Sequence, residues 1–78
     1  MAQHFIKCDK EVYLAVLQGV KKFEFRKNDR NYKLGDMVVL IETVGGAYTG
    51  YTCSVGPITY ILHGGSFGVP IDYCVFNW

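Results

Sequence analysis

The sequence lacks any long apolar run and contains few cysteines. These two features argue against a membrane protein and against a protein built on disulfides. No run approaches the ~18 apolar residues that a membrane-spanning helix needs, and no signal-peptide pattern begins the chain. We therefore expect a cytoplasmic protein with no membrane contact. The three cysteines, Cys8, Cys53 and Cys74, show neither paired nor metal-ligand spacing. We expect them to be reduced and mostly buried.

Motifs for metals and for nucleotide phosphates are also missing. His4 and His63 have no cysteine or carboxylate neighbours at ligand spacing, so we expect no metal site. The glycines at 64, 65 and 68 match no phosphate-binding loop, because no helix of adequate length follows them. We expect no cofactor. His63, beside these glycines, remains a candidate for lining a ligand cleft.

The chain does contain enough apolar surface for one small core. Its 78 residues are 50% hydrophobic and 15% aromatic, which suits a single folded domain over residues 1–78 and excludes a disordered tail. A domain of this size buries only about 60% of the surface that its unfolded chain exposes. It has little room for a second layer or a deep cofactor cleft.

Periodicity and turn residues predict the order of the elements. Asp9 is a good N-cap and Gly19 suits the residue after a helix end, which bounds a helix of about ten residues. Gly56-Pro57 predicts a break or bulge in a long strand. We expect strands over 3–8, 21–27, 37–41, 51–62 and 72–78, a glycine-rich turn over 45–50 and a flexible loop over 63–68. This order predicts an α+β fold, a small β-barrel of five to six mainly antiparallel strands with one short helix.

Positive charge is concentrated in one short segment. Residues 21–33 hold six of the eight lysines and arginines but only two of the seven acids, so their net charge is +4 and the rest of the chain carries −3. Such asymmetry favours a surface for a polyanion or an anionic ligand. The alternative is a solvated hairpin edge, since lysines often protect exposed strands.

The alternation of apolar and charged residues in this segment predicts that its charged side chains share one face of a strand. Side chains of a strand alternate between its two faces. We expect Phe23 and Phe25 to enter the core, so that Lys22, Glu24 and Arg26 project together from the opposite side. Two cations around one carboxylate would form a recognition surface there. The alternative is an exposed group of ion pairs that contributes little to stability.

One motif in this segment resembles the ASCH domains of the PUA-like superfamily. It runs Gly19-x-Lys21-x-x-Glu24-x-Arg26, with Gly35-Asp36 about ten residues later. The likeness to a compact ASCH-related family, common in bacteria and phages and largely of unknown function, covers nearly the whole chain. It continues through Asp29-Arg30, Tyr32, Tyr48-Thr49-Gly50 and Ile58-Thr59-Tyr60-Ile61-Leu62. The resemblance implies a PUA-like barrel with a cleft beside the helix, and an association with RNA and modified nucleotides.

The resemblance and the side-chain chemistry together suggest a division of roles. We expect Lys21, Glu24 and Arg26 to line the ligand cleft, where Arg26 offers a planar fork to a phosphate or a base edge. Glu24 can accept a hydrogen bond from an exocyclic amine. Tyr48 and His63 are further ligand-binding candidates. The expected contacts to the nucleic-acid backbone are Lys22, Lys27, Arg30 and Lys33.

Aromatic residues near turns have two interpretations. Tyr32, Tyr48, Tyr51 and Phe67 can stack on an unpaired base or fill the core. Tyr48 is the best stacking candidate, because the glycines around it hold it near the surface. Asp36, directly after a glycine, is expected to cap local backbone amides.

Two other functions remain open. Some ASCH proteins are small amidohydrolases that act on acetylated cytidine with a lysine, a threonine and a more distant glutamate. Here Lys21 matches the lysine, whereas Glu24 stands at the threonine position. In an enzyme, Lys21 and Glu24 would perform the acid–base work. The other possibility is a phage-type module that binds a host protein at its nucleic-acid site. The sequence leaves monomer and dimer open.

Overall fold

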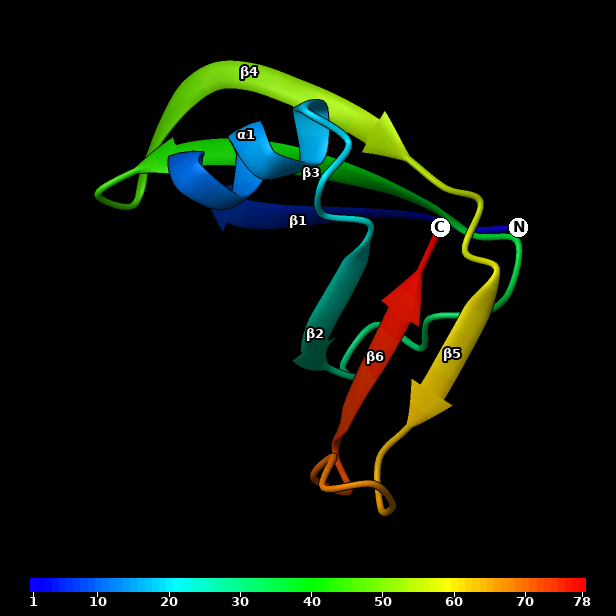
Figure 1. Ribbon diagram of the computed structural model, residues 1–78. Coiled ribbons are helices and arrows are strands. Elements are labelled where there is room, and N and C mark those ends of the chain that lie inside the picture. The colour runs from blue at the N-terminus through cyan, green and yellow to red at the C-terminus, as the bar shows by residue number, and fades with distance from the viewer.

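The fold consists of two small sheets and one helix (Figure 1). The computed structural model describes all residues, Met1–Trp78. One three-stranded sheet has the order β1-β3-β4 and the other has the order β2-β6-β5. The elements are β1 (Gln3–Asp9), α1 (Lys10–Leu17), β2 (Phe23–Lys27), β3 (Met37–Val44), β4 (Ala47–Val55), β5 (Tyr60–His63) and β6 (Tyr73–Asn77).

The first sheet carries the helix. β3 is its central strand, parallel to β1 and antiparallel to β4, which confirms the strand predicted from the apolar run over 37–41. α1 follows β1 directly and packs on β1 and β3 through the buried Tyr13 and Val16. Asp9 stands at the N-cap with extended backbone, although its side chain makes no capping hydrogen bond. Gly19, at φ 75°, takes the left-handed conformation just past the helix end.

The second sheet has one buried and one outward face. β6 lies between β2 and β5 and is antiparallel to both. The register pairs Glu24 with Phe76 and Arg26 with Cys74. Phe76 and Cys74 are almost completely buried, so this set of side chains looks inward. The alternate residues of each strand therefore look outward.

The structure confirms the α+β class but not the predicted barrel. It contains six strands and one short helix, yet no hydrogen-bonded strand pair joins the two sheets into a closed barrel. The long strand predicted over 51–62 is divided, since β4 ends at Val55 and β5 begins at Tyr60 in the other sheet. Gly56 and Pro57 lie at this break, where the prediction placed it. Proline has no N–H with which to continue a strand ladder.

The glycine-rich turn is shorter than predicted. The β3–β4 hairpin turns at Gly45 and Gly46, whose φ angles are 58° and 83°. Tyr48 belongs to β4 and pairs with Thr43 instead of lying in the turn. The later loop begins after His63, which closes β5.

A buried polar cluster joins the start of the chain to the start of β3. Oδ2 of Asp36 lies 2.7 Å from Nε2 of His4 and accepts a hydrogen bond of 3.1 Å from the Lys33 N–H. Oδ1 accepts from the Ala2 N–H at 3.0 Å. His4 and Asp36 are only 9% and 3% exposed. The predicted capping role of Asp36 is confirmed, and the same carboxylate also holds β1 beside β3.

The cysteines follow the prediction. All three are free, with Cys8 and Cys74 buried and Cys53 partly buried. The structure contains no helix with the length and apolar character that a membrane crossing requires. It brings together no group of three or more histidine, cysteine, aspartate and glutamate side chains that could hold a metal ion.

Candidate ligand cleft

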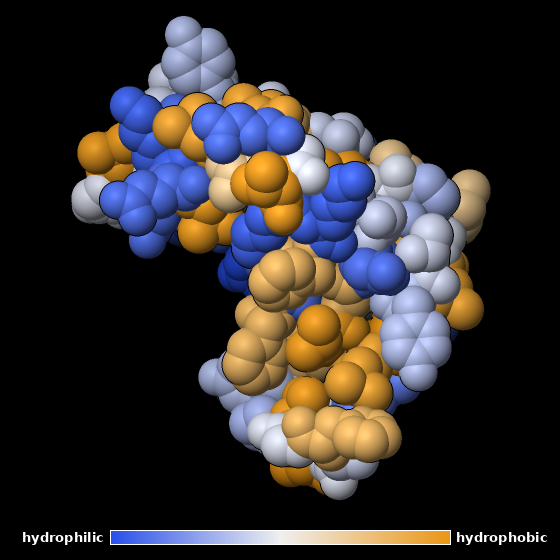
Figure 2. Space-filling view, viewed as in Figure 1, coloured by the Kyte–Doolittle hydropathy of each residue, from blue (hydrophilic) through white to orange (hydrophobic).

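An open cleft of about 390 Å³ lies where α1 and β1 approach β2. Figure 2 shows the molecule hollowed on this side, between the lobe that carries α1 and the second sheet. Lys21, Glu24 and Arg26 therefore share one concave surface. The residues that line the cleft are Lys7, Cys8, Asp9, Val12, Lys21, Phe23, Glu24, Phe25, Arg26 and Thr43.

The prediction of which face of β2 is buried is wrong. Phe23 and Phe25 are 50% and 54% exposed, whereas Glu24 is only 5% exposed. Glu24 and Arg26 share a face as predicted, but that face is the inward one. Lys22 precedes the strand, is exposed and does not line the cleft. A glutamate tolerates this position because two cations offset the cost of burying its charge.

The carboxylate of Glu24 lies between two cations. Its Oε1 accepts a hydrogen bond of 2.7 Å from Nζ of Lys21. Its Oε2 lies 3.7 Å from Nη1 of Arg26, which is an ion pair without a hydrogen bond. The side chain of Glu24 is 7% exposed and those of Lys21 and Arg26 are 19% and 31% exposed. Glu24 therefore sits deeper in the cleft than either cation, with Oε2 free to accept a hydrogen bond.

Lys21 is held in place with one donor to spare. The chain leaves α1 through Gly19, and the N–H of Lys21 still bonds to the Ala15 carbonyl at the helix end. Its Nζ donates to the Phe23 carbonyl at 2.6 Å as well as to Glu24. The ammonium also lies 5.0 Å from the Phe23 ring centroid. An ammonium has three donors, so one is left for a ligand.

Arg26 keeps more of its donors free. Nη1 donates to the Lys7 carbonyl at 3.2 Å, which fixes the guanidinium against β1. A guanidinium has five N–H donors in a planar fork. The side chain is 31% exposed. Arg26 can thus present a bidentate edge to a phosphate or a base while it remains anchored.

The cleft contains no activated nucleophile. Burial, and then the charge of Glu24, raise the pKa of the Cys8 thiol to about 11, so it is protonated at neutral pH. The Thr43 hydroxyl donates its proton to the Cys8 carbonyl at 3.2 Å. No histidine lines the cleft. The arrangement is suited to holding a ligand by charge and hydrogen bonds.

The other candidates from the sequence lie elsewhere. Tyr48 is 64% exposed on β4 and does not line the cleft, although Nζ of Lys7 lies 5.3 Å from its ring centroid. His63 lines a separate pocket with Tyr32, Lys33 and Tyr60. Tyr32 is buried at 2% exposure and fills the core, whereas Tyr51 and Phe67 are 69% and 87% exposed outside the cleft. Lys22, Lys27, Arg30 and Lys33 are all exposed.

Sequence reasoning missed the part of the cleft that β1 and β3 contribute. Lys7, Asp9 and Thr43 line the wall opposite β2. No local pattern marks them, because their role depends on which strand faces which.

Comparison with known proteins places this chain in a family. The sequence profile of a family described as a domain of unknown function, DUF3850, matches residues 3–78. The chain belongs to the DUF3850 family. One relative is the "Uncharacterized 12.9 kDa protein in GpA 3'region" of Escherichia phage P2, which is 47% identical over 47 residues. This match covers 60% of the present DUF3850 chain and 43% of the phage protein, so it spans less than half of that relative.

The ion pairs in this DUF3850 cleft predict a stability effect. Glu24→Gln keeps the side-chain shape but removes the negative charge that pairs with Lys21 and Arg26. We expect the free energy of unfolding to fall by about 1 kcal/mol at neutral pH, measured by urea denaturation. Glu11→Gln, which alters an exposed acid in the first turn of α1, should cost no more than about 0.5 kcal/mol. A Glu24→Gln variant as stable as the original protein would mean that Lys21 and Arg26 do not hold the carboxylate.

Proposed function

We propose that this DUF3850 domain binds nucleic acid, namely RNA or a modified nucleotide, in the cleft between α1 and β2. The observation that carries this proposal is that Lys21, Glu24 and Arg26 meet on the wall of one open cleft while keeping unused donors and acceptors. The resemblance of the same residues to the ASCH motif supports the proposal from the sequence side.

The three side chains would divide the work by chemistry. The free donors of Arg26 and Lys21 suit phosphate oxygens or the O6 and N7 acceptors of a purine. The free Oε2 of Glu24, deep in the cleft, suits an exocyclic amine, which a phosphate does not carry. A site with both signs of charge therefore favours a nucleobase or nucleotide over a simple anion.

The exposed cations near the cleft would contribute affinity for the nucleic-acid backbone that does not depend on base sequence. Lys22 immediately precedes β2, Lys27 is its last residue, and Arg30 follows three residues later. Each phosphate that such a cation neutralises releases counterions, so binding weakens as salt rises. Lys33 lines the pocket that contains His63 and lies away from the cleft, so its contribution would be smaller.

A titration with single-stranded RNA tests the proposal. The only tryptophan, Trp78, has its ring centroid 6.0 Å from Nζ of Lys21, so a ligand in the cleft should change its fluorescence. Fluorescence anisotropy of a labelled RNA of about 12 nucleotides should give an affinity whose logarithm falls linearly with the logarithm of salt concentration. Lys27→Ala should make this slope shallower by about 1.

The absence of binding to RNA, DNA and nucleotides at low salt would contradict the proposal. Release of cytidine from acetylated cytidine, with turnover that stops in Lys21→Ala, would replace a binding module with the amidohydrolase alternative, for which Lys21 and Glu24 share the cleft.

A further inference from the structure

The outward side of the second sheet carries three exposed aromatic rings. Phe23 and Phe25 on β2 are 50% and 54% exposed, and Tyr60 on β5 is 63% exposed. Figure 2 shows hydrophobic atoms over the front of this sheet in the orientation of Figure 1. We call this surface the aromatic face. Its residues are Phe23, Phe25, Lys27, Tyr60, Leu62, Tyr73, Val75 and Asn77.

The strand residues of the aromatic face carry one charge, and it is positive. This residue is Lys27. Lys22 immediately precedes β2 at one end of the sheet, and the exposed Asp72 immediately precedes β6 at the other. The carboxylate of β2, Glu24, points to the opposite side and is neutralised there by Lys21 and Arg26. An apolar surface whose own strand residues include a lysine and no carboxylate complements a polyanion that has apolar faces.

The aromatic face continues into the cleft. Phe23 and Phe25 belong to the aromatic face and also line the cleft beside Arg26. The ring of Tyr73 lies 5.4 Å from that of Phe25, centroid to centroid, so the ring surface extends from β2 onto β6. A chain whose end occupies the cleft can therefore continue over these rings as it leaves.

We propose that the aromatic face is a platform on which unpaired bases of a single-stranded nucleic acid stack beside the cleft. The inference rests on the nucleic-acid binding proposed above and identifies the form of the ligand. Aromatic rings on an open sheet stack on bases of any sequence, because every base has a π-face. Lys22 and Lys27 would meet the phosphates of the same segment.

The geometry favours a single strand over a duplex. Residues two apart on a strand, such as Phe23 and Phe25, are about 6.7 Å apart along it. This distance is roughly twice the 3.4 Å rise between stacked nucleotides in a duplex strand. Neighbouring bases can rest on both rings only if they separate from each other, which a single strand allows and a duplex prevents.

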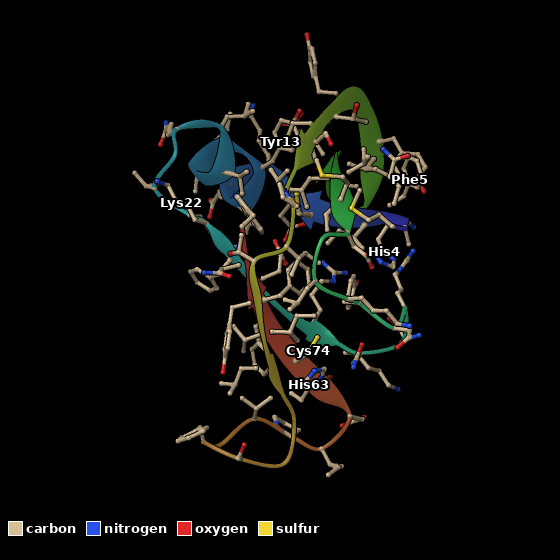
Figure 3. The ribbon with its side chains drawn as sticks, turned by 90° about the vertical axis from the view of Figure 1, so that its right-hand side faces the viewer. His4, Phe5, Tyr13, Lys22, His63 and Cys74 are labelled. Carbon is tan, nitrogen blue, oxygen red and sulfur yellow. The ribbon has the colours of Figure 1, made fainter.

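Two matched pairs of variants test the platform. Phe25→Ala and Tyr60→Ala each remove an exposed ring of the aromatic face, and Tyr60 does not line the cleft. Phe5→Ala and Tyr51→Ala remove rings of similar exposure, 52% and 69%, from the first sheet. Figure 3 shows Phe5 on the opposite side of the molecule from Lys22, which precedes β2.

The expected results separate stacking from charge. Phe25→Ala and Tyr60→Ala should each weaken binding of a single-stranded RNA about fivefold or more and leave the salt slope unchanged. Phe5→Ala and Tyr51→Ala should change the affinity for the single-stranded RNA less than about twofold. No variant should alter the affinity for the matching duplex, which binds more weakly. On irradiation, RNA that contains 5-iodouridine should crosslink to peptides that contain Phe25, Tyr60 or Tyr73.

Each contrary result has a distinct meaning. If only Arg26→Ala weakens RNA binding and the crosslinks are confined to the cleft wall, the stacking platform is contradicted and the proposed cleft site is retained. If Tyr60→Ala weakens binding while Arg26→Ala does not, the cleft proposal fails and the platform stands. A dimer in sedimentation velocity that Phe25→Ala dissociates, with RNA affinity unchanged, would make the aromatic face an interface between copies and overturn the platform.

Discussion

Arg26→Ala is expected to weaken the binding of single-stranded RNA by about 10- to 100-fold at moderate salt. The guanidinium is anchored by the Lys7 carbonyl and by the charge of Glu24, so its remaining donors are already oriented towards the cleft. Hydrogen bonds to charged groups contribute about 1.5–3 kcal/mol, which corresponds to this loss. Fluorescence anisotropy measures it directly.

Two variants show whether geometry or charge is responsible. Arg26→Lys keeps the charge but not the planar fork, so it should retain the salt slope and recover only part of the affinity. Lys10→Ala removes the same charge from α1 at a residue that does not line the cleft, and should change the affinity less than about twofold. Equal losses in Arg26→Ala and Lys10→Ala would mean that RNA responds only to net charge. Thermal unfolding of Arg26→Ala checks that the loss does not reflect a failure to fold.

Asp36→Ala is expected to lower the free energy of unfolding by about 3 kcal/mol. The change would leave the N–H groups of Ala2 and Lys33 and the ring of His4 without their acceptor in a site that is almost sealed from water. Buried polar groups that lose their partners cost about 1–3 kcal/mol each, and relaxation around the smaller side chain keeps each of the three groups near the low end of that range, so that the sum is about 3 kcal/mol. Urea denaturation at neutral pH provides the measurement. Asp72→Ala, at an exposed acid before β6, should stay within about 0.5 kcal/mol.

The same carboxylate predicts how stability depends on pH. Burial alone would raise the pKa of Asp36, but hydrogen bonds from the Ala2 N–H, His4 and the Lys33 N–H outweigh it and lower the pKa. Because the folded value is below the unfolded one, this stabilisation is fully present above about pH 4 and is lost as the pH falls through the folded value. Asp36→Asn should lack this part of the acid-induced loss. An unchanged slope below pH 4 in Asp36→Asn would contradict the assignment.

Local signals located the helix, the central strand and one strand break of this chain, but not the start of β4 at Ala47. Asp9 and Gly19 bounded the helix, the apolar run at 37–41 identified the central strand β3, and Gly56-Pro57 marked the break between β4 and β5. Each depends on backbone preferences within a few residues. The predicted closed barrel does not match the two separate sheets of the structure. Whether two sheets join depends on pairs of strands far apart in the chain, as in the pairing of Phe23 with Asn77, and local signals do not specify such pairs.

The candidate cleft was only partly predictable. Period two correctly put Glu24 and Arg26 on one face, and the ASCH-like motif singled out Lys21. Hydrophobicity then gave the wrong direction for that face, since it assigned Phe23 and Phe25 to the core. Lys7 and Thr43 on the opposite wall had no local signal, because they meet β2 only through the packing of the two sheets.

By itself, the sequence of this DUF3850 domain determined the limits of its helix, the strand break at Gly56-Pro57, the concentration of positive charge at residues 21–33, and that Glu24 and Arg26 share a face of β2. Only the tertiary structure decided that the charged face of β2 looks inward and the aromatic one outward. The physical reason is that the two faces of a strand are equivalent until another layer packs on one of them. Here that layer supplies Lys21 and the Lys7 carbonyl as partners for Glu24 and Arg26, so the ionic side chains are inside and the rings are left in water.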